Sequence, residues 1–231
     1  MYNGSDIAGT EDIVLVTLNY RTNIFGFPGA PDEPQNLGLR DIRTAVEWLR
    51  DNVAGFGGDP EKMVLTGQSA GGVAADYWSY AYTEDPIVRG IYASSGNAVS
   101  FPLNPPEIAQ DNWGLVVEGV NCSSAPDVMA CMRGVDWEDI RAVASAVKTR
   151  PSGNVLRPLS PFLPVEDGEI VMSDYLALTE AGSFAKIVST RLCLSPMSSQ
   201  DTLLTTARSP RCTATRTTKR ATTKSPPSAK E

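Results

Sequence analysis

The residues of this chain with the clearest chemical potential are Gly67-Gln68-Ser69-Ala70-Gly71, a G-x-S-x-G sequence. They follow an apolar run at 63–65 and precede small residues that suit a helix. A serine on such a strand-to-helix turn projects its hydroxyl away from the sheet, and the flanking glycines let strand and helix approach without a Cβ clash. The amide of Ala70 would then point at the oxygen of an attacked carbonyl. Ser69 is thus a candidate nucleophile, although a glycine-rich turn with a solvated serine fits the bare pattern equally well.

The elements that must position this serine can be read from the spacing of apolar residues. Residues 12–18 form a short run rich in β-branched residues, which predicts a buried parallel strand. Residues 39–53 have apolar positions at helical spacing and predict an amphipathic helix. Strands at 63–66 and 88–94 with a helix at 71–82 between them complete a parallel, doubly wound α/β pattern. The serine lies at a strand's carboxyl end, where open α/β sheets place their ligands.

Composition limits the classes of protein that the chain can be. Its 231 residues, 42% of them hydrophobic, suffice for one sizeable α/β domain. No segment approaches the roughly 18 consecutive apolar residues that a membrane helix needs, and residues 1–10 lack the basic and apolar regions of a signal peptide. The net charge of −7 combines an acidic part, residues 1–187, with a basic part, residues 188–231. The acidic part argues against nucleic-acid binding and is compatible with a soluble extracellular protein.

Residues 56–72 (FGGDPEKMVLTGQSAGG) resemble along their full length the nucleophile signature of the type-B carboxylesterases, which include cholinesterases and many lipases. Residues 12–28 and 36–52 resemble the strand, the N-Y-R segment and the helix that precede this signature. The resemblance covers roughly residues 1–187. It implies an α/β-hydrolase fold, a mostly parallel sheet with flanking helices, truncated here at both ends because members of the family are considerably longer. It also implies carboxylic ester hydrolysis, in which Ser69 forms an acyl-enzyme that water then hydrolyses.

The resemblance also assigns roles to several residues outside the G-x-S-x-G turn at 67–71, which we call the elbow. In the family the arginine of N-Y-R pairs with the aspartate of a later G-L-x-D segment; these are Arg21 and Asp41 here, and the pair would have a structural role. Two unrelated surface charges are the alternative. Ser95 matches a buried serine that lies behind the nucleophile, although a polar turn after a strand explains it equally well.

Two cysteines and two glycosylation sequons bear on whether the protein is extracellular or cytosolic. Cys122 and Cys131 resemble a disulfide of the family's secreted members, which implies an extracellular protein. Two reduced, buried cysteines in a cytosolic protein are the alternative. The sequons Asn3-Gly4-Ser5 and Asn121-Cys122-Ser123 weakly favour secretion.

The C-terminal part lacks the family's remaining catalytic groups. Residues 158–187 resemble its P-V-x-D-G segment, but we do not assign Asp167 as the catalytic acid, because this segment precedes the acid in the family and Asp167 occupies a turn. From Val188 the family pattern stops, and we interpret residues 188–231 as a disordered, basic, Ser/Thr-rich tail, derived from an intron or a shifted frame. We interpret its basic residues, such as Arg216, as solvated rather than as a nuclear or nucleic-acid signal.

The chain contains no histidine, and a glycine-rich oxyanion loop would lie before Met1. We therefore expect a carboxylesterase-type protein that is inactive or weakly active as written. Its substrate would be a small-molecule ester or a lipid. We expect no nucleic-acid partner, no transmembrane segment, no cofactor and no metal, and the sequence does not set the oligomeric state. The alternatives are a non-catalytic binding or adhesion-type member of the family and a fragment that does not fold.

Overall fold

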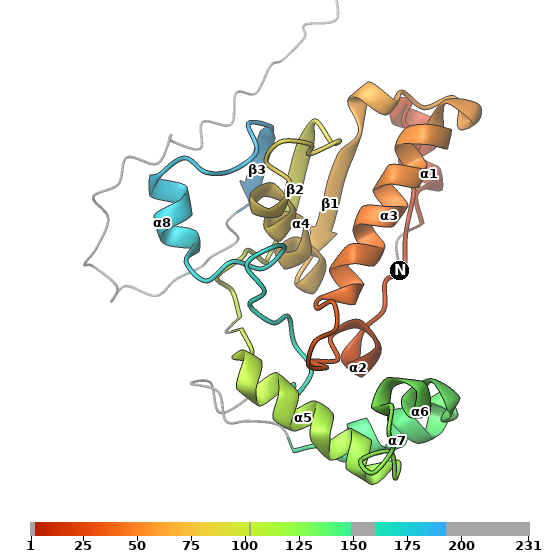
Figure 1. Cartoon of the computed structure of the whole chain (residues 1–231). Coiled ribbons are helices and arrows are strands. Elements are labelled where there is room, and N and C mark those ends of the chain that lie inside the picture. The colour runs from red at the N-terminus through yellow and green to blue at the C-terminus, as the bar shows by residue number, and fades with distance from the viewer. Residues whose placement is uncertain (1–2, 102, 149–159, 193–231) are drawn as a thin grey trace, which may run out of the picture. The chain divides into compact units, whose positions relative to one another are not determined.

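The computed structural model describes residues 3–101, 103–148 and 160–192, and the view in Figure 1 shows how their helices and strands are arranged. The elements, in chain order, are the helices α1 (Ser5–Glu11), α2 (Asn23–Gly26) and α3 (Leu37–Asn52), the 3-10 turns η1 (Val53–Phe56) and η2 (Pro60–Lys62), then β1 (Val64–Gln68), α4 (Ala70–Ala81), β2 (Gly90–Ser94), α5 (Pro106–Gly119), α6 (Val128–Gly134), α7 (Trp137–Ala146), α8 (Tyr175–Glu180) and β3 (Val188–Leu192). Within this part of the chain, no helix is long and apolar enough to cross a bilayer.

The sheet places its strands in the order β1-β2-β3, and both pairings are parallel. Val64 pairs with Gly90, and Gly90 pairs in turn with Val188. The helix α4 connects β1 to β2 and packs against both strands, as Figure 1 shows. The strands predicted at 63–66 and 88–94 and the helix predicted at 71–82 are therefore confirmed, with ends shifted by a few residues.

The predicted boundary after residue 187 falls at the start of a strand. Residues 188–192 form β3 and pair with β2, so the backbone groups of β2 are bonded on both of its edges. The predicted disorder is therefore wrong for these five residues, because the free edge of β2 offers them hydrogen-bond partners. The rest of the predicted tail, residues 193–231, lies outside the described residues.

The predicted strand at residues 12–18 is absent. The segment has no regular secondary structure, and Ile13 and Val16 are 46% and 49% exposed. Apolar β-branched residues form a strand only where another strand satisfies their backbone groups, and in the described structure β1 pairs with β2 alone. As a result β1 is an edge strand, and its Val64 is 60% exposed.

The main hydrophobic core lies where α3 and α8 meet α4. The predicted amphipathic helix is present as α3, and its apolar stripe of Leu39, Ile42 and Val46 is buried against α4. From the other direction Tyr175 of α8 stacks on Tyr77, with ring centroids 5.4 Å apart. Nine consecutive residues of α4 are buried, from Gly72 to Tyr80. The elbow helix is thus the central element of the core.

A second hydrophobic cluster is built by α5, α6 and α7. Cys122 and Cys131 form the disulfide that the family resemblance implied. Closing so short a loop contributes about 2 to 3 kcal/mol in the chain-entropy view. Of the two tryptophans in these helices, Trp113 is buried, whereas Trp137 is 57% exposed. Trp137 opens α7 and lies beside the guanidinium of Arg141.

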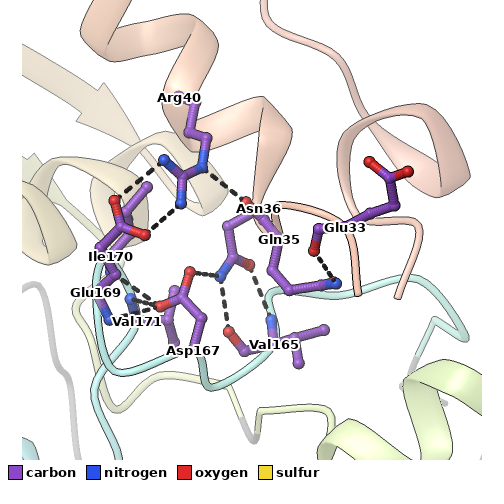
Figure 2. A network of polar contacts seen from close by, with 9 residues as sticks. All are labelled: Glu33, Gln35, Asn36, Arg40, Val165, Asp167, Glu169, Ile170 and Val171. Carbon is purple, nitrogen blue, oxygen red and sulfur yellow. Dashed lines mark hydrogen bonds and ion pairs between the residues drawn. The ribbon is translucent and has the colours of Figure 1, made fainter. Parts of the chain in front are cut away.

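A polar network joins the segment 165–171 to the start of α3, as Figure 2 shows. The Asn36 side chain is fully buried, accepts from the Val165 amide at 2.9 Å, and donates to the Val165 carbonyl at 2.7 Å. It also donates to Asp167 at 2.8 Å. Asp167 accepts three further hydrogen bonds, from the amides of residues 169–171. With both carboxylate oxygens occupied, Asp167 has a structural role in this turn.

Candidate active site

Ser69 occupies the single-residue turn between β1 and α4. It is the N-cap residue of α4, and its backbone has φ 53° and ψ −118°, a conformation that non-glycine residues rarely adopt. The Ser69 amide donates to the Ser94 carbonyl at 2.8 Å, and the Ser69 carbonyl accepts from the Val73 amide at 3.0 Å. The side chain makes no capping hydrogen bond and is partly exposed. The fold therefore holds the backbone of Ser69 on both sides in a strained turn.

The glycines around Ser69 differ in their structural roles. A Cβ on Gly67 would lie 2.2 Å from the carbonyl carbon and oxygen of Gly71, so this position excludes every larger residue. A Cβ on Gly71 would meet nothing within 4 Å. The expectation that both motif glycines prevent a Cβ clash is thus correct for Gly67 and wrong for Gly71, because the contact runs from the strand to the helix backbone. Sequence reasoning missed Gly96, whose Cβ would lie 2.2 Å from the Ser69 carbonyl oxygen.

Ala70, whose amide is the predicted oxyanion donor, directly follows Ser69 at the start of α4. It is the first residue of α4, and the N–H groups of a helix's first turn have no acceptor within the helix. These amides also carry the positive end of the helix dipole. Gln68 and Ala70 are exposed on either side of Ser69, so the motif is open to solvent in the described structure. The arrangement can stabilise negative charge that develops beside Ser69.

Ser95 does not lie where the family resemblance placed it. It follows β2 in a left-handed turn with φ 54° and is exposed, not buried. The contacts to the elbow come from its two neighbours instead, because the carbonyl of Ser94 binds the Ser69 amide and the backbone of Gly96 lies against the Ser69 carbonyl. The expectation of a buried serine behind the nucleophile is therefore wrong for Ser95.

Asp76 fixes the loop that follows β2, and no local sequence signal marks it. Its side chain is 3% exposed and lies two helical turns after Ser69 on α4. One carboxylate oxygen accepts from the Ala98 amide at 2.9 Å, and Ala98 is itself buried. Asp76 thus anchors the 95–98 loop, whose Gly96 contacts the backbone of Ser69.

Replacement of Asp76 by alanine is expected to lower the free energy of unfolding by about 1 to 3 kcal/mol, because the buried Ala98 amide loses its acceptor. Asp76→Asn keeps an acceptor oxygen and should have the smaller effect. Urea denaturation measures the loss, and hydrogen exchange at Ala98 shows whether it is local. Unchanged protection of Ala98 in Asp76→Ala would contradict the anchoring role.

Arg21 and Asp41 form the predicted pair. The guanidinium donates to both carboxylate oxygens, at 2.7 to 3.2 Å, and the Arg21 amide donates to the same group at 2.9 Å. These hydrogen bonds hold the pKa of Asp41 below its usual value, although burial acts in the opposite direction. Because Arg21 is half exposed, the pair is worth about 1 kcal/mol or less. The pair holds the segment at Arg21 against the first turns of α3.

A model of the carboxylesterase family matches residues 1–225. The chain belongs to the carboxylesterase family. Among curated relatives, a chlorogenic acid esterase of Aspergillus niger is 37% identical over 182 residues, which are 77% of this chain and 34% of that protein. A secreted triacylglycerol lipase of Gibberella zeae is 34% identical over 199 residues, or 80% of this chain and 34% of the lipase. This carboxylesterase-family chain thus spans about a third of the length of the relatives it matches.

The crystal structure of Aspergillus niger EstA is similar to this chain, with a TM-score of 0.69 and 30% sequence identity. The match covers 81% of this chain and 38% of EstA. The fold is therefore the predicted α/β-hydrolase fold, of which this chain forms a part. Within the described ranges, no group of three or more His, Cys, Asp or Glu side chains is placed to hold a metal ion.

Proposed function

We propose that Ser69 is the nucleophile of a carboxylic ester hydrolase. The observation that carries the proposal is the strained backbone of Ser69, held at the carboxyl end of β1 and followed at once by the first turn of α4. Its Oγ would attack the ester carbonyl carbon while a base takes its proton, and the resulting oxyanion would face the Ala70 amide. Expulsion of the alcohol leaves an acyl-serine, which water hydrolyses to the free acid.

The base of this reaction is not among the 231 residues, because the sequence contains no histidine. Serine hydroxyl is a weak nucleophile until a base accepts its proton. In a comparable enzyme the loss of the histidine alone lowers kcat by about 10⁶. We therefore infer that these 231 residues alone do not sustain turnover. A segment that supplies an imidazole would be required.

The proposal for the substrate class rests on the relatives of this chain. The two relatives above are named for the hydrolysis of chlorogenic acid and of triacylglycerols. We accordingly propose a small-molecule ester or a lipid as substrate. Several relatives are named as secreted lipases, and together with the Cys122–Cys131 disulfide this supports an extracellular location.

Added imidazole can test the nucleophile in the chain as it exists. We expect slow labelling of the 231-residue chain by a fluorophosphonate probe, and we expect millimolar imidazole to accelerate it by standing in for the missing base. Ser69→Ala should abolish the accelerated labelling. Ser145→Ala, which removes an exposed hydroxyl on α7, should leave it unchanged. Labelling that survives in Ser69→Ala would refute the nucleophile, and no adduct at high probe and imidazole would favour a non-catalytic binding protein.

A further inference from the structure

We propose that Asn121 carries an N-linked glycan. Asn121-Cys122-Ser123 is an acceptor tripeptide, with an amide donor two residues before a hydroxyl. The tripeptide lies in the turn between α5 and α6, at one end of the disulfide between Cys122 and Cys131. This inference is independent of the proposed hydrolysis.

The local backbone explains why an asparagine stands at this position. The Cys122 amide donates to the Val117 carbonyl, and the Asn121 amide donates to that of Glu118, both at 2.9 Å. These two bonds form a Schellman motif, a common helix end in which the residue at the position of Asn121 is left-handed. Asn121 has φ 62°, a conformation that asparagine tolerates better than most side chains. The helix end therefore favours asparagine through its backbone conformation, while both of its hydrogen bonds use backbone amides and leave the Asn121 carboxamide out of the cap.

The side chains of the tripeptide have the exposure that a bulky modification requires. Asn121 and Ser123 are exposed, whereas Cys122 between them is fully buried. Within the part of the chain that the structure describes, the Asn121 carboxamide makes no hydrogen bond. By contrast, the carboxamide oxygen of Asn3 in the other sequon accepts from both the amide and the hydroxyl of Ser5. A glycan on Asn121 would therefore displace no side-chain hydrogen bond among the described residues.

The modification requires a lipid-linked oligosaccharide diphosphate as the donor. The Nδ2 atom of Asn121 would form a bond to the anomeric carbon of the sugar, while the bond from that carbon to the diphosphate oxygen breaks. The amide loses one proton, and the lipid diphosphate leaves with the bonding electrons. The compartment that supplies this donor in eukaryotic cells also oxidises cysteines, in agreement with the disulfide that joins Cys122, the residue after Asn121, to Cys131.

The structure also sets the order of events. A transferase must enclose all three residues of the acceptor, but folding buries Cys122 completely and fixes Asn121 in a left-handed turn. Transfer must therefore precede closure of the disulfide, and the two processes compete. Slower closure should leave more time for transfer. Cys131→Ser removes the partner of Cys122 without altering the acceptor tripeptide, and should increase the fraction of chains that carry the glycan.

Cell-free translation with endoplasmic-reticulum microsomes tests the proposal on the full 231-residue chain, fused to a cleavable secretory leader. Protease protection identifies the imported chains, and endoglycosidase H treatment identifies the glycan. We expect a glycan whose loss requires Asn121→Gln or Ser123→Ala, and which Ser123→Thr retains. Asn3→Gln is the matched control and should leave the Asn121 glycan in place.

One result would overturn the glycan site, and another would overturn only the proposed order of events. If imported chains are not glycosylated, or if their only glycan is lost in Asn3→Gln and kept in Asn121→Gln, then Asn121 is not an acceptor. If Cys131→Ser fails to increase occupancy while Asn121→Gln abolishes it, the site stands but the competition with disulfide closure is refuted. Because transfer precedes folding, the result does not depend on whether Ser69 is active.

Discussion

Gly67→Ala is expected to lower the free energy of unfolding by more than about 4 kcal/mol, an exceptional loss for the addition of one methyl group. The new Cβ would lie 2.2 Å from two backbone atoms of Gly71. Carbon atoms in van der Waals contact are roughly 3.5 to 4.0 Å apart. A flexible side chain could rotate away from such a contact, but Gly71 presents its backbone. Relief would require β1 and α4 to separate at the residue that joins them.

The neighbouring hydrogen bonds explain why this separation is costly. Ser69 is bonded through its amide to Ser94 and through its carbonyl to Val73, so the turn is held to β2 and to α4 at once. Moving either element breaks one of these bonds and disturbs the strained turn. We therefore also expect Gly67→Ala to lose any labelling of Ser69.

Gly71→Ala provides the matched control, because it makes the same chemical change within the same motif. A Cβ there meets nothing within 4 Å, and alanine is the better helix former by up to about 1 kcal/mol. The free energy of unfolding of Gly71→Ala should lie within about 1 kcal/mol of the parent chain. Urea denaturation followed by circular dichroism compares the two variants. Equal losses in both would show that close approach at Gly67 is not the cause.

The elements that the sequence predicted correctly are those whose pattern is local. The stripe of apolar residues in α3, the strand β1, the helix α4 and the strand β2 can each be read from a short window, and each is present within a few residues of its predicted bounds. The Arg21–Asp41 pair and the Cys122–Cys131 disulfide join separate segments. Both came from the family resemblance, since no local pattern specifies a partner.

The predictions that proved wrong concern what covers a residue. Residues 12–18 have the composition of a buried strand, yet they are exposed because no strand of the described structure pairs with them. Ser95 was likewise expected in the interior and is exposed. Burial depends on how neighbouring elements are arranged. The residue types in a short stretch of sequence do not specify this arrangement.

The residues that sequence reasoning missed act through contacts across the fold. Asp76 binds a backbone amide 22 residues away, and Asn36 binds Val165, which is 129 residues away. In the sequence, an aspartate within a helix cannot be told from an ordinary polar residue. The same is true of an asparagine that precedes a helix. The close approach of Gly96 to the elbow was hidden for the same reason. Only the fold brings the partners together.

Asn36→Asp is expected to lower the free energy of unfolding at neutral pH by about 3 to 5 kcal/mol, the range found when a buried charge loses its compensation. The substitution preserves the shape of the side chain but replaces the Nδ2 donor with an oxygen. The Val165 carbonyl then loses a donor that lies 2.7 Å away, and a second carboxylate faces Asp167 across 2.8 Å. Asn36 is completely buried, so water cannot reach the side chain to screen the repulsion.

Asn121→Asp is the control for this substitution, because it makes the same change at another asparagine in the left-handed region. The two backbones are similar, with φ 56° at Asn36 and φ 62° at Asn121. Asn121 is exposed, and its side chain makes no hydrogen bond among the described residues. The free energy of unfolding of Asn121→Asp should therefore change by no more than about 0.5 kcal/mol. A comparable loss in both variants would assign the effect to the backbone conformation.

The dependence on pH separates repulsion between carboxylates from a simple loss of packing. In the parent chain burial raises the pKa of Asp167, but the amides of residues 169–171 and the Asn36 side chain outweigh it and hold this pKa below the ordinary 3.8. The stability that Asp167 contributes is therefore complete above pH 3.8 and is lost as the pH falls further. In Asn36→Asp the two facing carboxylates instead raise the pKa of the pair. Its penalty is present at neutral pH and disappears as a proton enters. Urea denaturation between neutral and acidic pH should thus show the two stability curves converging, whereas parallel curves would refute the repulsion.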